Sequence, residues 1–253
     1  MTLTPQMFLI VCPLLFLAGF VDAIGGGGGL ISLPAYLLAG VPMHQAIATN
    51  KLSSACGTAL ATARFIKKGL VNWRLGAPTI LAAMIGSGLG AKVSLATPEG
   101  IMERLLLFIL PVAAIIVLSP KAFADREGEE LRLDGRTWAI ALTSALTIGF
   151  YDGFYGPGTG TFLIIAFTAL ARMGLRRANA QSKIINLTTN LTSLGVFLMG
   201  GQVIFLLGLA GAACNMLGGY LGAGLAISKG SRITRPVILL VLGMLFLKVL
   251  GIL

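Results

Sequence analysis

The chain consists of long apolar runs separated by charged residues or by clusters of glycine and proline. Ten such segments follow one another, at about 6–24, 28–41, 44–66, 73–95, 101–119, 137–151, 158–171, 178–199, 203–228 and 233–252. A helix that crosses a bilayer needs roughly 20 residues, and the second, sixth and seventh segments have only about 14 each. The pattern predicts an all-α polytopic membrane protein with eight to ten transmembrane or re-entrant segments, some interrupted by glycine.

Composition supports this prediction. The 253 residues are 56% hydrophobic and 11% charged, whereas a typical soluble domain has about 25% charged residues. Apolar stretches recur along the whole length, so we expect one transmembrane domain over residues 1–253. The first basic residue is Lys51, which favours a retained first helix over a signal peptide. The three cysteines match no metal-binding spacing, and we expect no metal and no cofactor.

The basic residues are distributed unevenly. If the segments alternate across the membrane, 14 of the 19 basic residues fall in loops on one side. The positive-inside rule then places that side, with a linker at 120–136, in the cytoplasm and both termini outside. The net charge of +10 is therefore explained by the orientation of the chain in the membrane, and no nucleic-acid partner is expected. Segments one and two could instead form a hairpin that enters and leaves on one side, as could segments six and seven.

The sequence repeats itself at an offset of 130 to 132 residues. Three motifs recur in the same order: GFVD at 19–22 with GFYD at 149–152, ATNKL at 48–52 with AQSKI at 180–184, and GSGLGA at 86–91 with GGYLGA at 218–223. Each half, about 6–119 and about 137–252, holds an odd number of segments and must insert in the opposite orientation to the other. Inverted repeats with interrupted helices are typical of secondary transporters, whose substrate site lies near the midplane.

The interruptions are the stretches DAIGGGGG at 22–29 and DGFYGPGTG at 152–160. A broken helix gathers free N–H groups at the start of the next helix, and such N-termini attract anions. The candidate anion-binding glycines are Gly26, Gly27, Gly28, Gly156 and Gly158. The alternative is close helix packing, which also accounts for GSGLGA and GGYLGA.

Two lysines lie within otherwise uncharged segments, Lys51 and Lys183. A lysine at the centre of a membrane helix costs about 2.5–3.5 kcal/mol on insertion scales, so a repeated pair needs a reason. Polar residues flank both lysines, some at helical spacing, and the candidate substrate ligands among them are Asn50, Ser54, Ser182 and Asn186. Alternatively, the lysines form structural ion pairs with aspartates or extend to a membrane surface.

Asp22 and Asp152 are the only acids inside the apolar segments. Intramembrane carboxylates often relay protons, which makes both residues candidates for proton coupling. Each could equally cap the helix that follows it.

Five stretches together closely resemble the bacterial TauE/SafE family, whose members are called sulfite exporters. They are GFVDAIGGGGGLISLPA, ATNKLSSACGT, GFYDGFYGPGTGTF, AQSKIINLTTN and ISKGSRITRP. The resemblance implies a bacterial inner-membrane transporter of small sulfur-containing anions, such as sulfite or organosulfonates, frequently working outward. The motif residues that it carries over are Asp22, Gly25–Gly29, Asn50, Lys51, Asp152, Gly156, Pro157 and Lys183.

The expected partners are therefore a small anionic substrate, protons and the lipid bilayer. An uncoupled anion channel and a transporter of a non-sulfur carboxylate anion are the alternatives. The oligomeric state stays open, with a homodimer among the options. An intramembrane enzyme is not expected, because the sequence offers no nucleophile, base and orienting group in combination.

Overall fold

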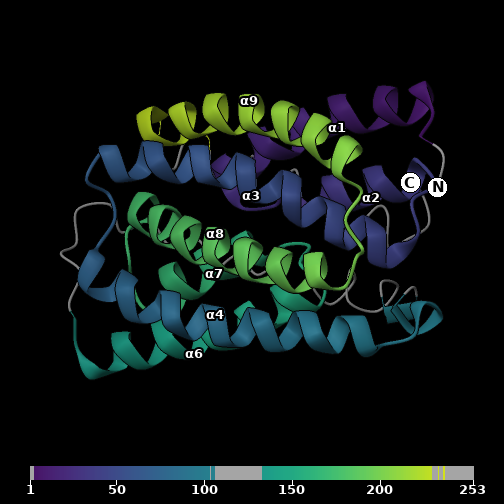
Figure 1. Cartoon of the computed structure of the whole chain (residues 1–253). Coiled ribbons are helices and arrows are strands. Elements are labelled where there is room, and N and C mark those ends of the chain that lie inside the picture. Colours follow the sequence, from purple (N-terminus) through teal and green to yellow (C-terminus); the bar gives the residue numbers. More distant parts are fainter. Residues whose placement is uncertain (1–2, 103, 106–132, 230–232, 234–235, 237–253) are drawn as a thin grey trace.

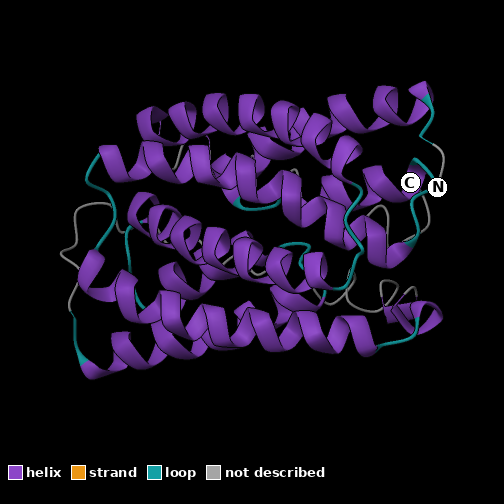
Figure 2. Cartoon of the chain, viewed as in Figure 1, coloured by secondary structure: helices purple, strands orange, loops and turns teal. Residues whose placement is uncertain are grey.

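The computed structural model describes residues 3–102, 104–105, 133–229, 233 and 236. Within these residues the regular structure is entirely helical (Figure 2). The elements are α1 (Pro5–Gly25), α2 (Gly29–Leu38), α3 (Met43–Lys67), α4 (Trp73–Ala96), α6 (Gly135–Phe154), α7 (Thr159–Ile165) with a π-helical turn (η2, Ala166–Leu170), α8 (Leu175–Met199) and α9 (Phe205–Lys229). The predicted fifth and tenth segments and the linker 120–136 lie largely outside the described residues.

The helices form a bundle in which the two halves of the chain interleave (Figure 1). The first helix of each half packs along the fourth helix of the other: α1 lies along α9, and α6 lies along α4. Small residues allow this close approach, because a Cβ on Gly218 would overlap the backbone of Phe16 and one on Gly90 would overlap that of Phe150. In GSGLGA and GGYLGA, these glycines serve helix packing. The long helices α3 and α8 contact each other between the outer pairs.

The short helices fold back along the helices that precede them. Leu15 of α1 shares a buried apolar cluster with Tyr36 of α2, and the ring of Tyr151 in α6 lies 5.7 Å from that of Phe162 in α7. A helix of the ten residues of α2 is about 15 Å long, half the hydrocarbon thickness of a bilayer. This geometry favours the hairpin arrangement that the sequence left open for both pairs.

The sixth segment is longer than the sequence predicted. It was expected at 137–151 and too short to cross a membrane, but α6 has 20 residues and extends to Phe154. At its start, Asp134 Oδ1 accepts a hydrogen bond of 2.8 Å from Thr137 N. Near its end, Gly153 lies so close to the backbone of Ser87 in α4 that a Cβ would overlap it. The prediction ended the helix at polar and glycine residues that the packing tolerates.

The described helices suit a membrane environment. Three of them, α1, α4 and α9, are long and apolar enough to span a bilayer. Large apolar side chains such as Leu81, Ile85, Leu209 and Leu217 are exposed on α4 and α9, as expected for lipid-facing surfaces. The order and lengths of α1 to α4 recur in α6 to α9, although opposite insertion of the two halves stays a prediction.

Candidate functional site

The two helix breaks meet at the centre of the bundle. Thr161, near the start of α7, donates from N to Gly26 O at 3.2 Å and from Oγ1 to Gly25 O at 2.9 Å. Gly26 has a left-handed backbone with φ 78°, and a Cβ on it would overlap the backbone of Gly160 and Thr161. Glycine at this position is therefore required both by conformation and by the contact between the hairpins.

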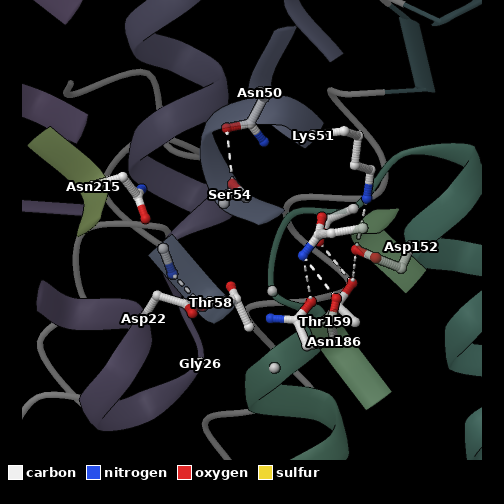
Figure 3. A pocket seen from close by; sticks show the side chains of 16 residues that line it. Asp22, Gly26, Asn50, Lys51, Ser54, Thr58, Asp152, Thr159, Asn186 and Asn215 are labelled. Carbon is white, nitrogen blue, oxygen red and sulfur yellow. Dashed lines mark hydrogen bonds and ion pairs between the residues drawn. The ribbon is translucent and has the colours of Figure 1, made fainter. Parts of the chain in front are cut away.

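A polar cavity lies beside this contact, lined by residues of both hairpins and of α3, α8 and α9 (Figure 3). The volume that the centre of a water molecule can occupy in this cavity is about 20 Å³. That space holds roughly one ordered water. The helix breaks and the long helices thus surround a contracted, hydrophilic site.

Most of the residues predicted for the site come together in this cavity. The lining includes Asp22, Gly26, Gly28, Asn50, Lys51, Ser54, Asp152, Gly156, Gly158 and Asn186. Three predicted residues do not line it: Gly27, Ser182 and Lys183. The Ser182 hydroxyl instead donates to Asn179 O at 2.8 Å within its own helix, and Lys183 is fully buried and bonded to Asp22.

The first charged pair joins α3 to the end of α6. Lys51 Nζ lies 3.0 Å from Asp152 Oδ1, with only 2% and 3% of the two side chains exposed. The same carboxylate oxygen accepts a hydrogen bond of 2.8 Å from Thr159 Oγ1. Asp152 Oδ2 is buried and has no hydrogen-bond partner among the described residues. This pair faces the cavity directly (Figure 3).

The second pair joins α8 to the end of α1. Lys183 Nζ donates to Asp22 Oδ2 at 2.6 Å and to the backbone oxygen of the same residue at 2.5 Å. Asp22 Oδ1 accepts from Gly28 N at 3.4 Å, near the start of α2. Lys183 is fully buried, whereas the Asp22 side chain is 16% exposed. Both carboxylate oxygens of Asp22 therefore have a donor.

The two pairs are formed between the halves of the chain. Each lysine lies eight residues after the first residue of its 25-residue helix, Met43 or Leu175, and each contacts the aspartate of the other half. The ion pairing that the sequence offered as an alternative is thus present, and neither buried lysine extends to a surface. Burial of four charges inside a bundle requires such pairing.

Amide and hydroxyl groups complete the wall of the cavity. Ser54 Oγ donates to Asn50 Oδ1 at 3.3 Å on α3, and Asn190 Nδ2 donates to Asn186 Oδ1 at 3.1 Å on α8. These groups offer donors and acceptors on opposite sides of one small space. Such a wall suits a ligand with several oxygen atoms.

Among the lining residues that the sequence did not predict is Asn215 of α9. Its signal was a single amide within an otherwise apolar helix. The repeat gave no help, because the corresponding region of α4 around Ala83 and Met84 is apolar. Thr58 and Asn190, each four residues after a predicted ligand on its helix, also belong to the lining.

Broken helices that meet around a buried, charged cavity in an apolar bundle are typical of secondary transporters. A family model described as sulfite exporter TauE/SafE matches residues 11–249. The chain belongs to this family of membrane transporters, which are not enzymes. The resemblance of its motifs to TauE/SafE is thereby confirmed.

Three relatives illustrate the similarity. A probable membrane transporter protein of Sinorhizobium sp., ORF9, is 36% identical over 226 residues, which cover 89% of this chain and 85% of the relative. A probable membrane transporter protein of Haemophilus influenzae is 35% identical, with 89% and 87% covered. YfcA of Escherichia coli K12, also a probable membrane transporter protein, is 33% identical over 248 residues, with 98% and 91% covered. No solved structure matches the chain.

Proposed function

We propose that the protein is a secondary transporter that carries small sulfur-containing anions, such as sulfite or organosulfonates, out of the cell across the bacterial inner membrane. The family description supports the sulfur-anion class. The observation that carries the proposal is the position of Lys51, a buried cation that lines a polar cavity between two helix breaks. A desolvated cation with amides and hydroxyls nearby is the chemistry that a small oxyanion requires.

In this proposal the anion binds Lys51 together with Asn50, Ser54 and Asn186, beside the N-terminus of α2 at Gly28. The glycines Gly26, Gly156 and Gly158 let backbone approach the ligand closely. The cavity holds roughly one water at present, so an anion of four or more heavy atoms enters only when the hairpins separate. A small site between two helical hairpins fits a transport cycle with alternating access.

The proposed orientation places the basic ends of the helices in the cytoplasm. Arg64 and Lys67 lie at the end of α3, Arg74 at the start of α4 and Lys229 at the end of α9. The α3–α4 connection is held to the first turns of α8 by a hydrogen bond of 3.3 Å from Asn72 N to Gln181 Oε1. Basic residues thus gather at one end of the bundle, which supports extracytoplasmic termini under the positive-inside rule.

The test is transport by purified protein in proteoliposomes. Sulfite, methanesulfonate and acetate are offered separately, and we expect flux of the sulfur anions that Lys51→Met abolishes without unfolding the protein. Lys92→Met is the matched control, because Lys92 lies on α4 and is not among the residues that line the cavity. Undiminished flux in Lys51→Met would remove Lys51 from the site, and flux of acetate alone would favour a carboxylate transporter.

A pH gradient separates a coupled transporter from the alternative, an uncoupled anion channel. With no other driving force, a proton-coupled transporter concentrates the anion inside or outside the vesicle. A channel only lets it equilibrate with the membrane potential.

A further inference from the structure

The two buried ion pairs differ in how completely their hydrogen-bonding groups are used. At Asp22, both carboxylate oxygens have donors, and Lys183 binds the carbonyl oxygen of the same residue as well. At Asp152, Oδ2 has no partner among the described residues although it is buried. Leaving a buried carboxylate oxygen without a donor costs free energy. The Asp152 pair is therefore the less completely bonded of the two.

The pairs also differ in their access to the cavity. Lys51 and Asp152 both line it, whereas only Asp22 of the other pair does so (Figure 3). An anion in the cavity can therefore reach the ammonium group of Lys51, but Lys183 is shielded by Asp22. Within the described lining, one cation faces the ligand, and that cation is already neutralised by Asp152.

We propose that the anion and a proton bind together by exchange at the Lys51–Asp152 pair: the anion takes the place of the Asp152 carboxylate on Lys51, and Asp152 takes up one proton. This inference rests on the proposed function and specifies how its site is coupled. A low-dielectric cavity strongly disfavours a net charge. The site thus alternates between Lys51⁺ with Asp152⁻ and Lys51⁺ with the anion and neutral Asp152.

The unpartnered oxygen gives this exchange a place for the proton. Protonated Asp152 carries an O–H that can donate to the anion or to an amide of the lining, whereas the ionised form only accepts. The proton comes from water on the side where the cavity is open and returns to water on the opposite side when the anion leaves. No bond other than that to the proton is made or broken.

The groups around Asp152 are compatible with this assignment. Lys51 faces it from α3 and Thr159 from α7, while the tyrosines on its own segment are Tyr151 and Tyr155. The neighbouring α8 contributes only the uncharged Asn186 and Asn190 to the cavity, and the Asp22 carboxylate is held by Lys183. Lys51 is the only charged side chain in contact with Asp152 among the described residues.

The experiment counts protons taken up on binding. Methanesulfonate is the probe, because its charge does not change across the pH range used. Calorimetric titrations of the purified protein at one pH, in two buffers with different ionisation enthalpies, give the number of protons per bound anion. We expect about one proton for the wild-type protein at a pH where Asp152 is ionised, and none for Asp152→Asn. The affinity of Asp152→Asn should also become independent of pH.

Asp22→Asn is the comparison variant, because it removes the other aspartate of the cavity. Once the variant is folded, each bound anion should still bring about one proton. Proton uptake that disappears in Asp22→Asn but persists in Asp152→Asn would overturn the assignment. If Asp152→Asn does not fold, the wild-type measurement still decides, because binding without proton uptake refutes the exchange.

The two proposals fail in different ways. Anion binding and flux without protons refute the exchange and leave the anion transporter standing. If the purified wild-type protein neither binds nor carries sulfite or methanesulfonate, the proposed function fails, and the exchange fails with it.

Discussion

Each of the two hairpins has a helix break at its tip, directly after an aspartate. The two tips differ in the residues that form the break and in how the aspartate is hydrogen-bonded. In the first half the break after Asp22 is a run of glycines, and the aspartate is fixed by Lys183 and the N–H of Gly28. In the second half the break after Asp152 contains Tyr155, Pro157 and Thr159, and one oxygen of the aspartate has no donor in the described structure. Repeated geometry therefore does not imply repeated function.

The difference follows from what each lysine can reach. Lys183 donates hydrogen bonds to both the backbone oxygen and the carboxylate of Asp22. These two bonds anchor α8 to the end of α1. Lys51 binds only the Asp152 side chain. A pair held through side chains alone can open without unwinding a helix, whereas opening the other pair also removes a hydrogen bond from a helix end. We infer that the Lys183–Asp22 pair anchors the bundle and that the Lys51–Asp152 pair exchanges.

The largest expected effect comes from neutralising each pair completely. The double variant Lys51→Met/Asp152→Asn should lose sulfur-anion flux in proteoliposomes down to the level of empty vesicles, because the cation that faces the cavity is gone. Lys183→Met/Asp22→Asn should retain measurable flux, since Lys51 still faces the cavity. Equal loss of flux in both would show that the pairs are equivalent and would contradict the comparison.

Stability should respond to single substitutions at both pairs. Lys51→Met leaves Asp152 unpaired and Lys183→Met leaves Asp22 unpaired, and removal of one partner of a buried pair costs about 3–5 kcal/mol. Neutralising the second partner should recover most of that loss. Thermal unfolding of the four single and two double variants in detergent measures these effects. If the single variants unfold at the wild-type temperature, the charges are not buried in the membrane-embedded protein.

The sequence predicted much of this arrangement, and the repeat was the reason. Asp22, Asp152, Lys51 and Lys183 stood out because charged residues recurred at matching places in apolar segments. Which lysine contacts which aspartate could not be predicted, because both crossed and uncrossed pairs satisfy the same spacing. The choice depends on how α3 and α8 pack between the outer helices, which is a property of the assembled bundle.

Other features had no local signal. Asn215 lines the cavity, but no polar residue in the first half corresponds to it. The end of α6 continues through Asp152 and Gly153, where its backbone lies close against Ser87 of α4, a contact distant in sequence. A pattern read along the chain ends a helix at polar residues and glycines, and only tertiary packing shows that they are tolerated.

The contact between the two tips can be tested at one glycine. Gly26→Ala should destabilise the protein by about 2–5 kcal/mol, since a left-handed backbone disfavours alanine by about 1–2 kcal/mol and overpacking adds about 1–3 kcal/mol. Gly40→Ala is the matched control: Gly40 has the same φ of 78°, but a Cβ there would meet nothing within 4 Å.

Gly40→Ala should therefore show the conformational cost alone, about 1–2 kcal/mol. The difference between the two variants isolates the contact of Gly26 with Gly160. Equal unfolding temperatures would mean that the tips separate at no cost, and transport should then be unaffected by Gly26→Ala.

The smallest expected effect distinguishes the starts of the two halves. Asp134 caps α6 through a hydrogen bond from Thr137 N, which lowers the pKa of Asp134 below its usual value, whereas Thr4 makes no side-chain cap at the start of α1. A depressed pKa means that this stabilisation is present above the unfolded-state pKa and is lost as the pH falls through the folded-state pKa. Asp134→Ala should thus lower the unfolding temperature slightly at about pH 7, and by less at about pH 3, which is below the usual aspartate pKa of about 3.9. Thr4→Ala should leave it unchanged at both, and an equal shift in the two variants would show that the Asp134 cap contributes nothing specific to α6.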